Sequence, residues 1–141
     1  MMIEILFRAK RKNWRELPKE EWWVEGYPVK YQPCASKEEW IYGIVPTYAS
    51  ALYIIEIDPE TLCQYVYMND KNGKRIWEND IIKHETSDTI GTVKWYQEDY
   101  LGWCVDDVMI DEQQFTDEMW DECEVIGNIF DHPELLKGET E

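Results

Sequence analysis

The sequence contains few histidines and no closely spaced pair of cysteines. Its 141 residues include only two histidines, His84 and His132, and the four cysteines form no CxxC pair. A zinc site is therefore disfavoured. The sequence also has no glycine-rich phosphate loop and no serine nucleophile elbow. We predict no catalytic residue, no metal ligand, no cofactor and no cofactor-binding residue.

Long apolar runs are absent as well. No stretch approaches the roughly 20 apolar residues that a membrane helix needs. The basic residues within 8–12 interrupt the only early apolar run, and no small-residue cleavage site follows it, so a secretory signal is not indicated. We therefore expect a cytoplasmic protein with free thiols and no membrane contact.

Positive charge is scarce and unevenly spread. The chain has 14 Lys and Arg against 30 Asp and Glu, which gives a formal net charge of −16. Residues 1–15 hold five cations against Glu4, a net of +4, whereas residues 97–141 hold fifteen acids against Lys137, a net of −14. Such an acidic surface repels phosphate backbones, so a nucleic-acid partner is disfavoured. Solubility is the favoured interpretation, and a basic protein partner or a decoy for a DNA-binding protein is the alternative.

Aromatic residues, by contrast, are abundant. They make up 14% of the chain, and eight of them are tryptophans. One large aromatic side chain can bury roughly 150–250 Å², so many of these residues are expected in the core. A surplus of tryptophan also suits a face that binds a protein partner. The core is the favoured interpretation of the two.

Short β-prone runs separated by turn residues dominate the pattern. Asn72-Gly73 and Glu78-Asn79-Asp80 are turn signals, because asparagine and glycine accept a positive φ. Regularly spaced short strands favour a small barrel or paired sheets over βαβ units. The predicted strands span residues 3–7, 22–24, 29–31, 40–45, 52–57, 62–68, 76–77, 81–84, 89–96, 100–105 and 123–130.

These runs predict a mainly β fold with few short helices. Residues 1–67 form a β-rich N-terminal region, and residues 68–138 form an SH3-like small barrel, together making one compact unit. Residues 106–121 are polar and acidic and are expected to be a long loop with some helix. A short terminal helix is predicted from Pro133.

Seven stretches of the chain carry a family likeness, namely residues 5–10, 23–27, 57–61, 64–65, 70–74, 76–83 (IWENDIIK) and 124–136 (EVIGNIFDHPELL). In their order and spacing they resemble the YopX family of phage and prophage proteins. Two departures stand out: Val66-Tyr67 replaces the usual Thr-Gly, and Asn79 replaces a glycine. Asn79 can keep the same backbone turn, whereas Tyr67 cannot freely take a glycine conformation, so the approach to the first turn is expected to differ.

The resemblance implies a mostly β protein with an SH3-like barrel in its C-terminal half. It also implies a viral or mobile-element origin inside a bacterial cell. It does not imply an enzymatic activity, and no catalytic residue is carried over from it.

One group of side chains could do chemistry in principle. Asp80, Glu85 and Asp88 surround one hairpin close to His84, and a carboxylate beside a histidine can form an acid–base pair. The favoured interpretation is that Asp80 caps a turn by accepting backbone N–H bonds. The acidic pairs between residues 106 and 122 could collect a divalent cation, but a solvated acidic face is the favoured interpretation.

Three functions therefore stand in order. The first is a non-catalytic module that binds a protein partner, which includes a second copy of the chain. The second is an acidic DNA mimic or counter-defence protein, and the third is an enzyme acting on a nucleotide or a small polar substrate.

Overall fold

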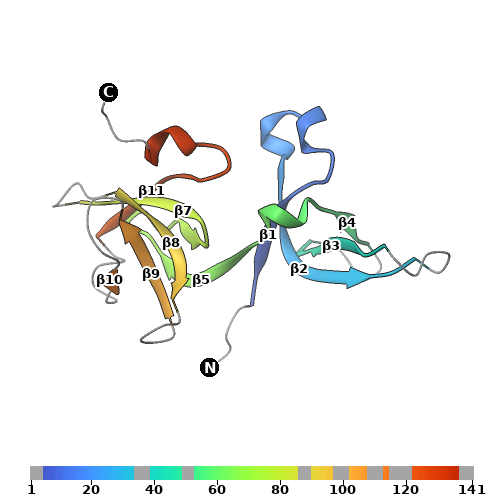
Figure 1. The fold of residues 1–141 in the computed structure, drawn as a ribbon, viewed down its shortest axis with the longest axis horizontal. Helices are drawn as coiled ribbons and strands as arrows, with labels where there is room; N and C mark the ends of the chain where they lie inside the picture. Colours follow the sequence, from blue (N-terminus) through green and yellow to red (C-terminus); the bar gives the residue numbers. More distant parts are fainter. Residues whose placement is uncertain are drawn as a thin grey trace. The chain divides into compact units, whose positions relative to one another are not determined.

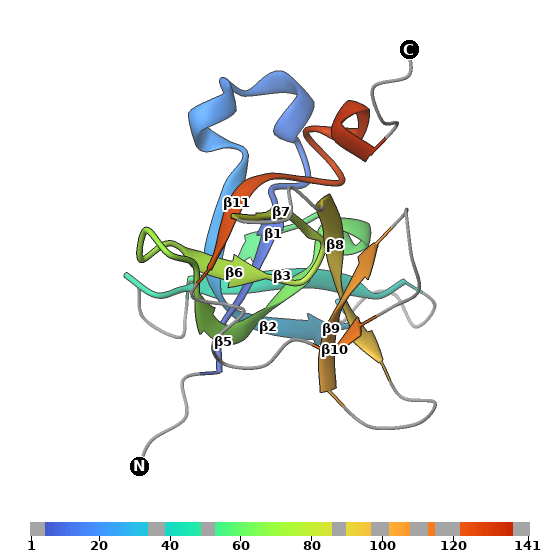
Figure 2. The same ribbon diagram turned by 90° about the vertical axis from the view of Figure 1, so that its left-hand side faces the viewer.

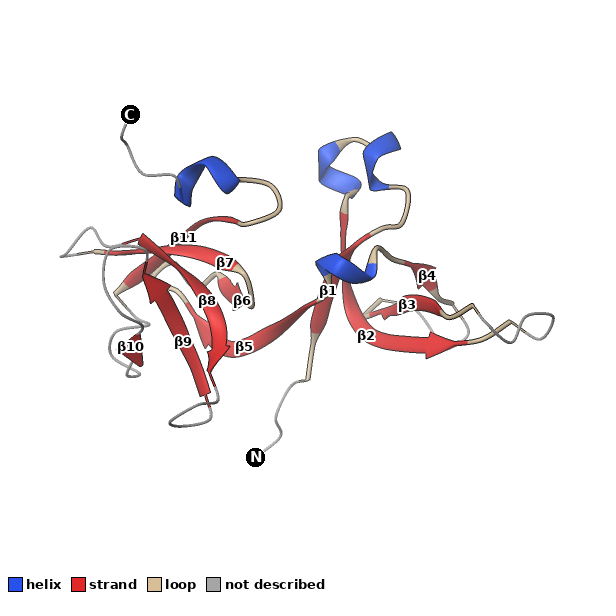
Figure 3. Ribbon diagram, in the orientation of Figure 1, coloured by secondary structure: helices blue, strands red, loops and turns tan. Residues whose placement is uncertain are grey.

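The computed structural model describes residues 5–33, 39–48, 53–85, 90–96, 102–107, 113–114 and 122–136. The described strands pair antiparallel, and the described helices are short 3-10 turns of three or four residues. A mainly β fold with few short helices is therefore confirmed (Figures 1 and 3). No helix in the described ranges is long and apolar enough to cross a membrane.

The elements follow one another along the chain as alternating strands and turns. The strands are β1 (Phe7–Lys10), β2 (Trp23–Tyr31), β3 (Ile41–Pro46), β4 (Ile55–Glu56), β5 (Cys63–Asn69), β6 (Arg75–Trp77), β7 (Asp80–His84), β8 (Ile90–Tyr96), β9 (Gly102–Asp107), β10 (Gln113–Gln114) and β11 (Cys123–Asn128). The 3-10 helices are η1 (Trp14–Glu16), η2 (Lys19–Glu21), η3 (Pro59–Thr61) and η4 (Pro133–Leu136). The chain divides into two compact units, residues 1–64 and 65–141.

The first unit is a sheet in the order β4-β3-β2-β1, with the first residues of β5 paired to β1. Its core lies on one face, because alternate residues of a strand point to opposite sides and cross-strand partners share a side. Ala9 pairs with Val24, and Ile44 pairs with Ile55, so these side chains meet on that face. Ile57 completes the cluster.

β2 changes partner at Gly26. This residue is aligned with Phe7 of β1 and also with Pro46 of β3. A Cβ atom at Gly26 would overlap the carbonyl oxygen of Val45. Glycine lets the two backbones approach this closely, so the β1 and β3 halves of the sheet can join.

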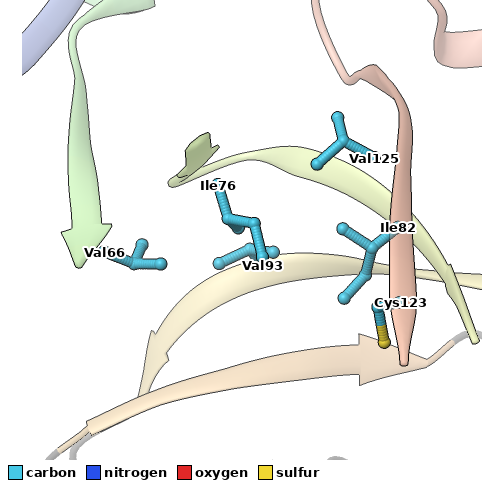
Figure 4. Close-up of a cluster of buried hydrophobic side chains, with 6 residues drawn as sticks. All are labelled: Val66, Ile76, Ile82, Val93, Cys123 and Val125. Carbon is cyan, nitrogen blue, oxygen red and sulfur yellow. The ribbon is translucent and has the colours of Figure 1, made fainter. Parts of the chain in front are cut away.

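The second unit has a five-stranded sheet in the order β10-β9-β8-β7-β11 and a hairpin of β5 and β6 (Figure 2). Apolar side chains from the hairpin and the sheet meet in one core (Figure 4). The members of this core are Val66, Ile76, Ile82, Val93, Cys123 and Val125. The described strand pairs of this sheet do not close into a ring, so an SH3-like barrel is not confirmed.

β5 contributes to both units. Its residues Cys63 and Gln64 pair with β1, whereas Tyr65 and Asn69 pair with β6. The register with β6 shifts between Tyr65 and Asn69, and Tyr67 lies within this irregular segment with a φ of 70°. The strand predicted over residues 62–68 is therefore present but irregular.

Other predicted elements are displaced rather than missing. The first described strand occupies residues 7–10 rather than 3–7, and β4 covers only two residues of the predicted run 52–57. The strand over 90–96 and the turn of helix at Pro133 match the prediction. Most of the predicted acidic loop, 106–121, lies outside the described residues. That the N- and C-terminal regions form one compact body stays a prediction.

Candidate functional site

The carboxylate at the Asn72-Gly73 turn is used to build the fold. Asp70 is only 5% exposed. Its Oδ1 accepts hydrogen bonds from the backbone N–H groups of Asn72 at 2.9 Å and Lys74 at 2.8 Å. Its Oδ2 accepts the N–H of Val125 at 3.0 Å. Asp70 therefore ties the β5–β6 turn to β11.

Asp80 has the same structural role at the next turn. The side chain is buried, and its Oδ2 accepts the backbone N–H of Trp77 at 2.8 Å, as the turn-capping prediction required. The neighbouring Asn79 has a φ of 71°. Its N–H donates to the carbonyl oxygen of Val93 at 2.8 Å, and its own carbonyl accepts from Ile129 at 3.1 Å. This turn thus joins β8 to the segment after β11.

The histidine of the predicted acid–base group has a different neighbour from those proposed. His84 Nε2 lies 3.0 Å from Glu122 Oε1, on the residue just before β11. The Glu85 carboxylate lies 3.4 Å from Lys71 Nζ. Asp88 lies outside the described residues. The structure therefore gives His84 a carboxylate partner that sequence reasoning missed, because residues 84 and 122 meet only through the pairing of β7 with β11.

A cysteine and a histidine are brought side by side in this same pairing. Cys123 is the register partner of His84, and its side chain is buried in the core. Burial raises the pKa of the Cys123 thiol to about 12, and the negative charges of Glu122 and Asp70 add to the shift. A cysteine nucleophile acts as the thiolate, and the raised pKa favours the protonated thiol at neutral pH.

Metal binding has no support in the part of the chain that the structure describes. No group of three His, Cys, Asp or Glu side chains there could hold a metal ion. The buried carboxylates of Asp70 and Asp80 are committed to backbone N–H groups.

The first unit holds a cluster of cations and indole rings that sequence reasoning did not assemble. Lys10 is 1% exposed, and its Nζ lies 3.7 Å from the ring centroid of Trp14 and 4.4 Å from that of Trp22. The ring of Trp23 lies 5.6 Å away, and the guanidinium of Arg8 stacks on it at 4.6 Å. These distances fit cation–π attraction, which is stronger when the cation is desolvated.

The segment between β1 and β2 holds this cluster in place. Trp22 Nε1 donates to the carbonyl oxygen of Leu17 at 2.9 Å, and Trp14 Nε1 donates to Asp58 Oδ2 at 3.4 Å. Arg11 donates to the carbonyl oxygen of Glu21. The loop therefore folds over one end of the sheet face that carries Lys10, and the cluster stabilises the fold.

The other end of that sheet face carries exposed aromatic residues. Tyr27 is 50% exposed and Tyr31 is 40% exposed, and both lie on the same side of β2 as Trp23. Their cross-strand partners on β3 are Val45 and Ile41. We call the surface formed by Tyr27, Val29, Tyr31, Ile41 and Val45 the tyrosine face.

The middle and rim of the tyrosine face are also defined. Gly43 is opposite Val29, and a Cβ there would lie 2.5 Å from Cγ2 of Ile54, so Ile54 covers this position. At the rim, Arg8 is aligned with Glu25. Lys12 Nζ, just after β1, lies 3.1 Å from a carboxylate oxygen of Glu56, the other register partner of Gly43. These four charged residues beside the face comprise two cations and two carboxylates.

The signal for this face was present but incomplete. The alternation of large residues in 27–31 predicts a strand with one apolar side, and its exposure depends on which residues cover that side. Further exposed aromatics lie elsewhere in the first unit, namely Trp40, Tyr48 and Tyr53.

Comparisons with known proteins give the family and the fold. The family model described as YopX protein matches residues 7–137. The chain is similar to the crystal structure of protein EF1440 from Enterococcus faecalis, with a TM-score of 0.52 and 19% sequence identity, over 96% of this chain and 99% of that one. At this identity the likeness concerns the fold. No curated protein matches the chain.

Proposed function

We propose that this chain, which belongs to the YopX family, is a non-catalytic module that binds a protein partner. The observation that carries the proposal is the tyrosine face, an apolar sheet surface on which Tyr27 and Tyr31 are half exposed. Aromatic residues are enriched at protein interfaces, and tyrosine is among the residues that dominate binding energy there.

The side chains that could take part in catalysis support the same proposal. Asp70 and Asp80 are hydrogen-bonded to backbone N–H groups, and the thiol of Cys123 is protonated at neutral pH because its pKa is about 12. The stretches that resemble the family therefore contribute turns and core in this chain. Reactive groups that converge on a cavity would be needed for an enzyme.

The remaining alternatives have less support. In an acidic DNA mimic, carboxylates on the surface take the place of phosphates. Asp70 and Asp80 are buried, so these two carboxylates cannot serve in this way. Most of the acidic residues in 97–141 lie outside the described residues, so the mimic stays a hypothesis. An SH3-like barrel in the C-terminal half, a phage or prophage origin and a location in the bacterial cytoplasm also stay predictions.

Photo-crosslinking of the full chain tests the proposal. A benzoylphenylalanine in place of Tyr27 is expected to form a discrete adduct with one protein in host cells, because this position lies at an interface. The matched control carries the same group in place of Asn72, an exposed turn residue of the second unit. Adduct formation that is absent or equal at both positions would contradict a protein-binding role for the tyrosine face.

A further inference from the structure

We infer that the tyrosine face is covered in solution by the same face of a second copy of this chain. This inference rests on the proposed function, because it names the partner of that surface.

Both faces of the first sheet carry apolar side chains. One face carries the core formed by Ala9, Val24, Ile44 and Ile57. The opposite face carries aromatic and β-branched residues on adjacent strands, where Tyr27 is aligned with Val45 and Tyr31 with Ile41. A sheet with a solvated face normally alternates apolar and polar residues, so two apolar faces indicate that the second one is also covered.

Among the described residues of the first unit, the segment between β1 and β2 covers one end of this face. The cluster of Lys10, Trp14 and Trp22 lies over that β1 end, and the covering segment contains η1 and η2. Beyond Gly26 the side chains of Tyr27 and Tyr31 remain 50% and 40% exposed. Within the described part of the first unit, one surface of the sheet therefore has a covered end and an end whose two tyrosines are half exposed.

Charge distinguishes a second copy from other partners. The first unit has eight Lys and Arg against ten Asp and Glu, a net of −2, and the second has six against twenty, a net of −14. Like charge makes two copies repel each other, and that repulsion is weakest through the nearly neutral first unit. A strongly basic partner would be attracted to the second unit instead.

A strongly acidic partner is also disfavoured, because the cations beside the tyrosine face already have neighbours within the chain. The guanidinium of Arg8 is stacked on Trp23, and Lys12 is paired with Glu56. A neutral apolar surface with a balanced rim is complementary to itself. Such a surface suits a two-fold contact in which the same patch is used by both copies, with the two sheets packed face to face.

Sedimentation equilibrium of the full chain at low and high salt is the test. The wild type is expected to be a dimer whose association strengthens with salt, because screening reduces the repulsion between two chains of −16. The double variant Tyr27→Glu/Tyr31→Glu is expected to associate at least tenfold more weakly, about 1.4 kcal/mol. Circular dichroism checks that the variant is folded.

A control and a charge swap make the result specific. The control Tyr48→Glu/Tyr53→Glu places the same charges on exposed tyrosines outside the face and is expected to leave the dimer unchanged. Mixing Tyr27→Glu/Tyr31→Glu with Tyr27→Lys/Tyr31→Lys is expected to restore association, since each face then meets its opposite charge. Equal weakening by the control, or no recovery on mixing, would overturn the two-fold contact.

The outcomes separate this inference from the proposed function. A wild type that is monomeric at every concentration, together with an adduct between position 27 and a different protein, overturns the second copy and leaves the binding function intact. A monomer that also gives no adduct at position 27 overturns both.

Discussion

Two non-glycine residues of the described chain have a positive φ. They are Asn79 at 71° and Tyr67 at 70°, the two positions at which the family resemblance led us to expect glycine. The expectation for Asn79 is confirmed, since asparagine keeps the turn. Tyr67 also has a positive φ, a conformation that a tyrosine does not take freely, and the expected difference in the approach to the first turn stays a prediction. The ring of Tyr67 lies 5.5 Å from that of Tyr65, and the Tyr65 hydroxyl donates to Asn69 Oδ1 at 2.8 Å.

Because Tyr67 is strained, we expect glycine to be more stable than alanine at this position, which is the reverse of their usual order in a strand. A left-handed conformation costs a residue with a side chain about 1–2 kcal/mol. Tyr67→Gly and Tyr67→Ala both remove the ring contact, and only the alanine keeps the strain. We expect the glycine variant to be more stable by about 1 kcal/mol, as measured by urea unfolding.

The neighbouring residue supplies the control for this comparison. Met68 belongs to the same strand and is not among the positive-φ residues. At such a position glycine is less stable than alanine by about 0.5–1 kcal/mol. The same order at positions 67 and 68 would show that Tyr67 is not strained.

The buried thiol of Cys123 makes stability depend on alkaline pH. The pKa of Cys123 is raised from 9.0 to about 12 in the folded protein, mainly by burial. Between these values the unfolded chain loses the thiol proton while the folded chain keeps it. The stabilising contribution is therefore complete below pH 9.0 and is lost as the pH rises toward about 12.

Chemical unfolding across this pH range checks the contribution of the thiol. The free energy of unfolding of the wild type is expected to fall more steeply between pH 9.0 and about 12 than that of Cys123→Ala, which has no thiol to ionise. Cys63 remains in both proteins, so its contribution cancels. Identical slopes would mean that Cys123 ionises equally in both states.

At the scale of the element, the ring of His132 packs against Gly127 near the end of β11. The register of β11 shifts between Val125 and Gly127. A Cβ at Gly127 would lie 2.7 Å from Nδ1 of His132, which also accepts the N–H of Asn128 at 3.3 Å. The amide oxygen of Asn128 accepts the N–H of Asp131 at 2.9 Å. These contacts hold η4 against the end of the strand.

A double-mutant cycle tests the contact between Gly127 and His132. Gly127→Ala is expected to destabilise the protein by about 1–3 kcal/mol, since the methyl group must displace the imidazole ring. In the His132→Ala background the same change is expected to cost clearly less, because the space is open. The cycle is measured by urea unfolding, and two costs that agree within about 0.5 kcal/mol would mean that the two residues do not interact.

At the scale of the whole molecule, local signals could be predicted from sequence and long-range ones could not. The turns at Asn72-Gly73 and Asn79 were predictable because the required backbone conformations belong to those residue types. The cluster of indole rings around Lys10 depends on the alignment of Lys10 with Trp23. The His84–Glu122 pair depends on the alignment of β7 with β11. Registers between distant strands are set by packing, so the sequence pattern indicated strands without their neighbours.

The candidate site follows the same division. The absence of a reactive centre was an expectation from composition, and it stays an expectation. The tyrosine face required the pairing of β2 with β3 and the exposure of the two tyrosines. Neither quantity is visible in a single sequence without a partner strand.

β5 has a consequence for how this gene can change. The division between the two units falls between Gln64 and Tyr65, inside a strand whose two ends pair with β1 and with β6. Recombination that exchanged one half between relatives would join two half-strands of different ancestry at this point. Each hybrid would have to satisfy both neighbours at once, so the halves are expected to be inherited together.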